Sequence, residues 1–271
     1  MNLIRIGCSG WSYPEWSGIF YPRGTRNLFT AYSSFFNTVE INSTFYNFPS
    51  DGTVGKWIRQ AEGRDFLYSV KIPSSVTHDL LLRNRVECRK AMTDFEERVL
   101  MRMKIAGKLC SALIQLSPFT NERNISDVYD LISALDTSSL TYAVEPRHTS
   151  IYGGSSFNEE ISKLGAVPVS LDSPERPLED ILMSGGKAYV RLHGRNLADW
   201  KSHTGMPMAR YNYRYRTEEI AKLAKMISPL KEMGDIFVYF NNHPNGNAPL
   251  NAVELLGKLE NSGNPIQRSL F

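Results

Sequence analysis

Three side chains that can carry a positive charge alternate along one short stretch of the sequence, at Arg191, His193 and Arg195. Alternate residues of an extended strand point to the same face, so these three side chains can converge. Arginine offers paired donors to phosphate or carboxylate oxygens, and histidine can transfer a proton near neutral pH. We therefore interpret the triplet as part of an anion-binding site. The alternative is an internal salt-bridge network with Glu145 and Asp172.

Two carboxylates and a lysine lie at the ends of other apolar runs, namely Glu40, Glu145 and Lys71. Two carboxylates in one dry cavity have pKa values that are pushed apart. Glu40 or Glu145 can therefore act as a general base, with His193 as the acid. Either carboxylate could instead neutralise a buried arginine or lysine. Lys71 could hold a substrate phosphate or carboxylate, act as an amine nucleophile, or pair with one of the two glutamates.

The remaining candidates for substrate binding are polar residues at or shortly after apolar runs. Amide side chains would orient the bound anion, and additional cations would neutralise it. Histidines and carboxylates in the same region could also ligate a divalent metal, but no HxH or HExxH spacing indicates one. The cofactor therefore stays open. These further candidates are Asn42, His78, Gln115, Arg147, Asp172, Asn241, Asn242, His243 and Asn251.

Aromatic side chains crowd the first fifty positions, Phe45 and Tyr46 among them, and alternate with arginine over residues 210–216. Exposed rings can stack nucleobases or sugars. Most aromatic residues, however, pack in cores and loops. We interpret 210–216 as a solvated loop before a helix that starts at Thr217, with a nucleic-acid clasp as the alternative.

Eight short apolar runs must position these residues. Near-continuous apolar runs are typical of strands that are buried on both faces of a parallel sheet. Helical patterns at 51–62, 86–103, 125–135, 157–164, 217–233 and 252–259 separate several of the runs. The runs cover residues 3–7, 38–41, 66–70, 112–116, 140–144, 167–171, 188–192 and 236–240.

Eight strands that alternate with helices in 271 residues predict a (β/α)8 TIM barrel, which typically needs about 250 residues. A doubly wound open sheet would give a similar pattern, but no GxGxxG turn follows the first run. No linker rich in proline, glycine or serine divides the chain, so we expect a single barrel domain over residues 1–271. In such a barrel the candidate residues would gather at the mouth formed by the carboxyl ends of the strands.

Composition excludes several classes of protein. The chain is 42% hydrophobic, which argues against disorder, and its net charge of +3 is too small for a dedicated nucleic-acid coat. Any anion site must therefore be local. Three cysteines without a CxxC pair argue against a disulfide framework and a cysteine zinc site, and favour reduced thiols in the cytoplasm. We see no signal peptide and no apolar run of about 18 residues, so no membrane partner is expected.

Five spaced motifs carry a resemblance to a known family. They are residues 7–22, residues 36–46 with Pro49, Lys71-Ile72-Pro73 with Thr77-His78, residues 189–195, and residues 239–243 with Gly246, Ala248 and Asn251-Ala252. Across nearly the whole chain the sequence resembles the domain-of-unknown-function 72 family, also called YecE-like. The resemblance implies a TIM-barrel fold and no established activity. The chain departs from the family pattern at Ser117, Pro146 and Ile151, whereas the acid Glu145 and the Arg147-His148 pair are kept.

The leading hypothesis is an enzyme that acts on a phosphorylated or otherwise anionic substrate at the barrel mouth. Phosphoester hydrolysis in a nucleotide or nucleic acid is the reaction we favour. One alternative is a non-catalytic nucleotide or nucleic-acid binding protein, and another is a sugar-phosphate isomerase that uses the two carboxylates. The expected partner is a small phosphorylated molecule or a nucleic acid. The sequence does not predict the oligomeric state.

Overall fold

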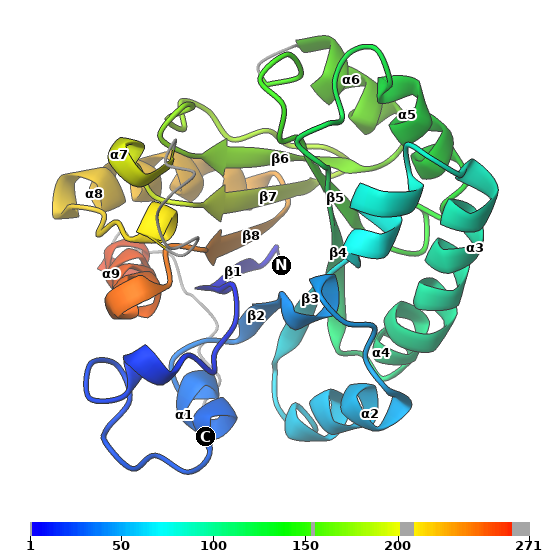
Figure 1. Ribbon diagram of the computed structural model, residues 1–271. Coiled ribbons are helices and arrows are strands. Elements are labelled where there is room, and N and C mark those ends of the chain that lie inside the picture. The colour runs from blue at the N-terminus through cyan, green and yellow to red at the C-terminus, as the bar shows by residue number, and fades with distance from the viewer. Residues whose placement is uncertain (1, 153–154, 201–208, 262–271) are drawn as a thin grey trace. The chain divides into compact units, whose positions relative to one another are not determined.

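The computed structural model describes residues 2–152, 155–200 and 209–261 (Figure 1). Eight strands within these residues form one sheet in the order β1-β8-β7-β6-β5-β4-β3-β2. The pairings of β1 with β8, β8 with β7, β6 with β5, β5 with β4 and β4 with β3 are all parallel. A parallel bridge between Ser9 and Glu40 joins the chain just after β1 to β2. This is the strand order of a (β/α)8 barrel, which confirms the predicted fold class and rejects the open sheet.

The strands follow the predicted apolar runs, with ends that differ by a few residues. Their burial is near complete along their length, as expected for strands of a parallel sheet that is covered on both faces. They are β1 (Ile4–Cys8), β2 (Thr38–Ile41), β3 (Leu67–Lys71), β4 (Leu109–Gln115), β5 (Tyr142–Glu145), β6 (Val167–Asp172), β7 (Lys187–Leu192) and β8 (Asp235–Phe240).

Helices occupy each predicted helical segment, although 86–103 is divided into α3, a π-helical turn (Glu96–Leu100) and α4. Ser50 caps α2 by accepting a hydrogen bond from the Thr53 amide, so the polar residue before the helix sets its start. None of the helices in the described ranges is long and apolar enough to cross a bilayer. The helices are α1 (Leu28–Ser33), α2 (Asp51–Gln60), α3 (Arg85–Phe95), α4 (Met101–Ile105), α5 (Ile125–Ser133), α6 (Ser155–Lys163), α7 (Leu197–Trp200), α8 (Thr217–Ile227) and α9 (Asn247–Asn261).

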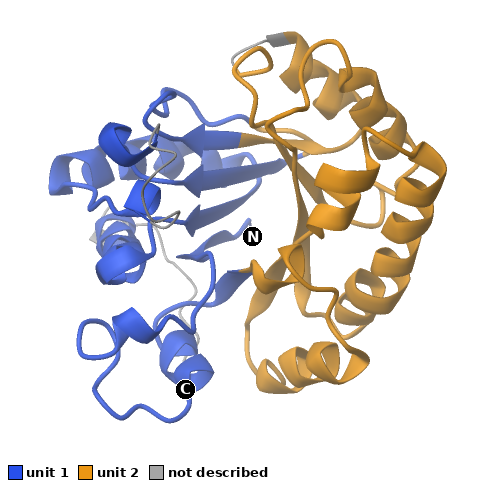
Figure 2. Cartoon of the chain, in the orientation of Figure 1, with its two compact units in different colours: residues 1–40, 170–182, 186–271 blue, residues 41–169, 183–185 orange. Residues whose placement is uncertain are grey.

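The chain divides into two compact units (Figure 2). Unit 1 comprises residues 1–40, 170–182 and 186–271, and it contains β1, β7, β8, α1 and α7–α9. Unit 2 comprises residues 41–169 and 183–185, and it contains β3–β5 with α2–α6 on one side of them (Figure 2). The single domain expected over 1–271 stays a prediction.

Close backbone approach fixes the turn before β8 in unit 1. A Cβ at Gly234 would overlap the carbonyl group of Gly186, which accepts a hydrogen bond of 2.9 Å from the Asp235 amide. Only glycine fits at this position without moving the backbone.

All three cysteines are free, in agreement with the absence of a disulfide pattern. Cys8 and Cys88 are buried, and Cys110 is half-buried. Burial raises the pKa of Cys88 to about 11 and raises that of Cys8 further. Both buried thiols are therefore protonated at neutral pH.

Candidate functional site

Polar and charged side chains lie at or just after the carboxyl ends of the strands in both units. That all of them gather at one barrel mouth stays a prediction. The three acids among the candidates, Glu40, Asp172 and Glu145, have no exposed surface. Burial of a carboxylate is costly unless donors surround it, so the partners of each acid define what it can do. Unit 1 holds Glu40, Asp172, Arg191, His193, Arg195, Asn241, Asn242, His243 and Asn251, and unit 2 holds Asn42, Lys71, His78, Gln115, Glu145 and Arg147.

In unit 1, Glu40 of β2 and Arg191 of β7 form a buried ion pair. The Arg191 Nη2 atom lies 2.7 Å from Glu40 Oε1, and Nε lies 2.9 Å from Oε2. Ser9 and Tyr189 donate the other two hydrogen bonds, at 2.6 and 2.7 Å. Burial alone would raise the pKa of Glu40, but the Arg191 charge and these donors outweigh it and lower the pKa. Glu40 thus neutralises a buried arginine, as in the second interpretation of this carboxylate.

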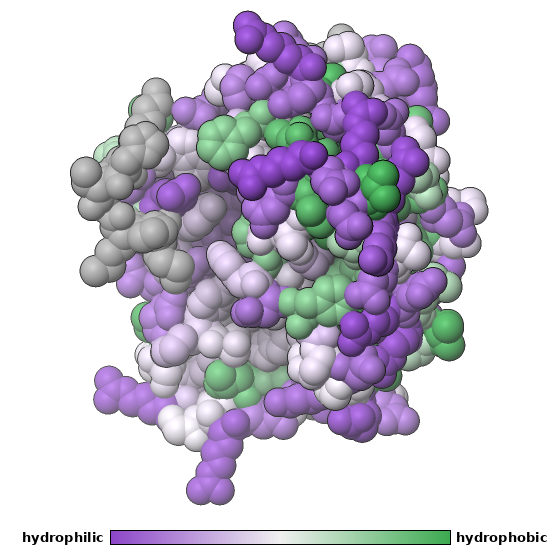
Figure 3. Space-filling view, turned by 45° about the vertical axis from the view of Figure 1, so that its right-hand side comes forward, coloured by the Kyte–Doolittle hydropathy of each residue, from purple (hydrophilic) through white to green (hydrophobic). Residues whose placement is uncertain are grey.

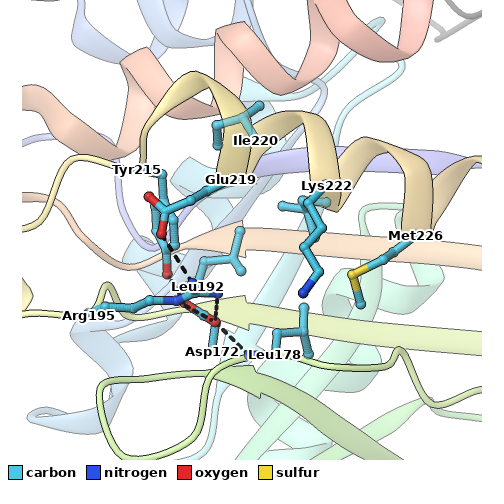
Figure 4. Close-up of a pocket in the computed structure, with 10 residues that line it drawn as sticks. Asp172, Leu178, Leu192, Arg195, Tyr215, Glu219, Ile220, Lys222 and Met226 are labelled. Carbon is cyan, nitrogen blue, oxygen red and sulfur yellow. Dashed lines mark hydrogen bonds and ion pairs between the residues drawn. The ribbon is translucent and has the colours of Figure 1, made fainter.

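A second network in unit 1 joins Asp172 of β6 to Arg195, which follows β7 (Figure 4). The Arg195 Nη2 atom lies 2.7 Å from Asp172 Oδ1, and Arg195 Nη1 lies 3.1 Å from Glu219 Oε1 on α8. The Tyr215 hydroxyl donates to Asp172 Oδ2 at 2.5 Å. Hydrogen bonds to Asp172 raise the pKa of Arg195. The network lies beside a small pocket that is partly open to solvent and is lined also by apolar residues of α8 such as Ile220.

The 210–216 stretch differs from the solvated loop that we expected. Arg214 and Arg216 are exposed, but Tyr215 is buried on Asp172. The Asn251 side chain holds this loop, since its Oδ1 accepts from the Tyr215 amide at 3.1 Å and its Nδ2 donates to the Tyr215 carbonyl at 2.9 Å. Asn242 donates to Asn251 Oδ1 at 3.1 Å. These two candidate amides therefore fix the backbone of the protein itself.

His193 and Asn241 form a buried pair at the ends of β7 and β8. The amide nitrogen of Asn241 lies 2.8 Å from His193 Nδ1. An amide nitrogen can only donate, so Nδ1 is the acceptor and the imidazole proton resides on Nε2. The ring also contacts Tyr211, with centroids 5.6 Å apart, and Trp200, with centroids 6.1 Å apart. In this tautomer Nε2 can donate a hydrogen bond, and the acid role expected of His193 stays a prediction.

His243 is enclosed by the aromatic residues that follow β1. Its ring stacks on Tyr13 with centroids 4.3 Å apart, and its carbonyl accepts a hydrogen bond from Trp16 Nε1 at 2.8 Å. Burial lowers the pKa of His243, while Glu15, with Oε1 3.7 Å from Nδ1, acts in the opposite direction. His243 thus secures the first loop of unit 1 to the end of β8.

In unit 2, four candidates form a continuous row across the ends of β3, β4 and β5. Lys71 Nζ donates to Gln115 Oε1 at 2.8 Å, and Gln115 Nε2 donates to Glu145 Oε1 at 2.6 Å. Arg147 Nη1 reaches the same Glu145 oxygen at 3.4 Å. The parallel register places Gln115 directly beside Glu145, and this brings the side chains together. Lys71 therefore meets Glu145 through an intervening amide.

Phe45, which we had not singled out as a site residue, links this row to His78. Lys71 Nζ lies 3.8 Å from the centre of the Phe45 ring, and the His78 ring meets the same phenyl group edge-on at 5.0 Å. The segment is anchored because Thr44 Oγ1 donates to the Lys71 carbonyl at 2.6 Å. Thr77 Oγ1 and His78 Nδ1 share a hydrogen bond of 2.8 Å. The aromatic crowding near residue 45 was the signal available in the sequence, but it did not distinguish this ring from its neighbours.

Burial and two nearby positive charges act on the pKa of His78. Burial lowers the pKa of His78 to about 4, with further contributions from the charges of Lys71 and Arg147. His78 is therefore uncharged at neutral pH. Asn42, another candidate of unit 2, follows β2. Its buried Oδ1 has no hydrogen-bond partner within the part of the chain that the structure describes.

No group of three or more His, Cys, Asp and Glu side chains suited to hold a metal ion occurs among the described residues. Metal use therefore stays open, as it was from the sequence.

Comparison with known proteins gives a family. Residues 5–270 match the family described as "Protein of unknown function DUF72". The UPF0759 protein YunF of Bacillus subtilis is 27% identical over 99% of this chain and 100% of its own length. The UPF0759 protein YecE of Escherichia coli (strain K12) is 28% identical over 63% of this chain and 60% of its own. A solved DUF72 family protein from Thermotoga maritima is 28% identical, covers 95% of this chain and 99% of that one, and superposes with a TM-score of 0.81. The chain belongs to the DUF72 family.

Proposed function

We propose that this protein is an enzyme that hydrolyses a phosphoester whose phosphate binds in unit 2, at the carboxyl ends of β3–β5. The observation that carries the proposal is the row of Lys71, Gln115, Glu145 and Arg147, which holds two cations at the ends of these strands. Burial is the main cause that lowers the pKa of His78 to about 4, and the positive potential of Lys71 and Arg147 lowers it further. Because the groups are largely buried, that potential is screened less than at the surface.

The three side chains suit a phosphate group. Lys71 supplies a compact charge, Arg147 supplies a planar fork of donors, and neutral His78 can donate a single hydrogen bond. Positive groups aimed at phosphoryl oxygens stabilise the charge that develops during transfer. In this proposal the anion does not need Arg191 or Arg195, because Glu40 and Asp172 already accept hydrogen bonds from them.

Glu145 is the proposed general base. Gln115 Nε2 at 2.6 Å orients its carboxylate, and Arg147 lies on the same oxygen. Glu145 takes a proton from a water molecule as the water oxygen bonds to phosphorus. The phosphorus–oxygen bond to the leaving group then breaks, and the leaving oxygen takes a proton from solvent.

Turnover of a panel of phosphoesters, including monoesters, diesters and nucleotides, tests the proposal, with and without a chelator to reveal any metal dependence. Glu145→Gln should lower kcat by a factor of about 10² to 10⁴, as for loss of a general base. Lys71→Ala and Arg147→Ala should mainly raise KM. Lys56→Ala removes an exposed lysine of α2 and should change neither constant. Wild-type turnover in Glu145→Gln, or binding of esters without any product, would overturn the enzymatic proposal.

A further inference from the structure

Two aromatic side chains near the proposed phosphate site are exposed to solvent. Tyr46 is 77% exposed and Phe119 is 76% exposed. Tyr46 follows β2 and Phe119 follows β4, whereas the exposed apolar residues Val86 and Ile105 lie on helices. Large exposed rings are unusual, because their burial is strongly favourable, and they often mark a binding surface.

Tyr46 lies close to the lysine of the row, and Phe119 follows the strand that carries Gln115. Tyr46 meets the Phe45 ring edge-on at 5.3 Å, and Phe45 in turn carries Lys71 Nζ at 3.8 Å. Phe119 is four residues beyond Gln115, so their Cα atoms are at most about 14 Å apart. In the strand order, β3 with Lys71 lies between β2 and β4. The two rings thus follow the strands on either side of the lysine.

Backbone hydrogen bonds order the two loops that carry these rings. The Phe119 amide donates to Ser117 Oγ at 3.1 Å, and the Phe119 carbonyl accepts from Asn124 Nδ2, also at 3.1 Å. The Tyr46 amide donates to the Ser43 carbonyl at 3.2 Å. Ordered loops that present exposed rings need little rearrangement to bind a planar partner.

We propose that the phosphoester of the proposed function belongs to a single-stranded nucleic acid, whose unpaired bases stack on Tyr46 and Phe119 while the phosphate between them binds Lys71 and Arg147. This inference rests on the proposed function. The rings follow the two strands that flank the strand of Lys71, and this order calls for a base on each side of the phosphate, which a mononucleotide lacks. Bases in a duplex are stacked on one another and do not offer their faces.

The surface chemistry agrees with such a partner. On the face shown in Figure 3, hydrophobic side chains are scattered in small groups among hydrophilic ones. A protein partner would call for a larger continuous apolar patch. Isolated rings beside cations are typical of single-strand binding, in which stacking and backbone charge act together. The net charge of +3 limits the contact to a short segment of the strand.

Fluorescence anisotropy with a short labelled oligothymidylate, and with an abasic oligomer of the same length, tests the inference. The measurements use Glu145→Gln so that the probe is not consumed. Tyr46→Ala and Phe119→Ala should each weaken oligothymidylate binding about 5- to 100-fold and leave abasic binding unchanged. Tyr46→Phe should bind like the parent, since it keeps a ring. Ile105→Ala removes a side chain that is 82% exposed and should change nothing.

The outcomes separate this inference from the proposed function. Lys71→Ala should weaken binding of both probes and reduce the salt dependence by about 0.7 in the log–log slope. If Lys71→Ala weakens both probes but the aromatic variants weaken neither, the phosphate site stands and the stacking inference fails. If thymidine monophosphate binds as tightly as the oligomer, with the same dependence on both rings, the ligand is a mononucleotide and the proposal of a single-stranded nucleic acid is wrong. If Lys71→Ala has no effect on either probe, the proposed function fails.

Discussion

Replacement of Arg191 by methionine should destabilise the protein severely. Glu40 and Arg191 are 0% and 1% exposed, and two hydrogen bonds of 2.7 and 2.9 Å join them. Removal of one partner from a buried ion pair typically costs about 3–5 kcal/mol, because the other charge stays buried without compensation. A domain has only about 5–15 kcal/mol of stability, so the loss is a large fraction of the total. Urea unfolding of wild type and Arg191→Met at neutral pH measures it.

The pH dependence of this loss has a definite sign. In the wild type the folded pKa of Glu40 lies below the usual value of 4.5, so ionised Glu40 stabilises the fold above that pH and the stabilisation is lost on acidification. In Arg191→Met the burial of Glu40 remains while the guanidinium is absent, so the folded pKa rises. The variant then loses stability as the pH rises from the usual pKa of 4.5 toward the raised folded pKa of Glu40. The difference between the two proteins should therefore shrink as the pH is lowered.

Two controls sharpen the test. Arg98→Met breaks an exposed pair with Asp94 and Asp51, at 3.6 and 3.5 Å, and should change the free energy of unfolding by less than about 1 kcal/mol. The double variant Glu40→Gln/Arg191→Met removes both charges and should recover part of the stability. The reasoning is refuted if Arg191→Met costs less than about 1 kcal/mol at neutral pH, or if its cost is the same at acid pH.

Two further predictions concern His78 and the glycines. An NMR titration of the His78 ring should give a pKa of about 4, and added phosphate should raise it. A pKa near the usual value of 6.5 would contradict the effect of burial and of the charges of Lys71 and Arg147. Because the folded pKa is lowered, His78 should also make the fold less stable as the pH falls from 6.5 to about 4, and His78→Gln should remove that slope. Gly234→Ala would force the Cβ against the Gly186 carbonyl and should cost about 1–3 kcal/mol in thermal or urea unfolding. Gly257→Ala, in α9 with open space around it, should instead stabilise by about 0.5–1 kcal/mol, and equal effects at both positions would contradict the packing argument.

The sequence predicted the fold well because the signal for buried parallel strands is local. Near-continuous apolar runs gave all eight strands, and the alternation with helices gave the barrel. The short helices α1 and α7 were missed, since six and four residues are too few to show a helical period. The end of β5 was placed one residue early because Glu145 is charged, although it is a buried strand residue.

The partners within the site were less predictable, because they depend on contacts between distant parts of the chain. Arg191 and Glu40 are 151 positions apart, and no local pattern says which carboxylate an arginine meets. The salt bridge with Asp172 that was suggested for the triplet is present and is made by Arg195, whereas Arg191 pairs with Glu40, which that alternative did not name. Tyr215 was assigned to a solvated loop because its neighbours are arginines, whereas its hydroxyl is buried on Asp172.

The different environments of the three thiols have a practical consequence. Thiolates are the reactive species, and burial keeps Cys8 and Cys88 protonated, so a maleimide dye should attach first to half-buried Cys110. Cys110 lies near the start of β4, five residues before Gln115, which corresponds to roughly 17 Å along the strand. The native chain can therefore carry one fluorophore at a known separation from the proposed phosphate site. Energy transfer to a dye on an oligonucleotide would then report occupancy without any engineered cysteine.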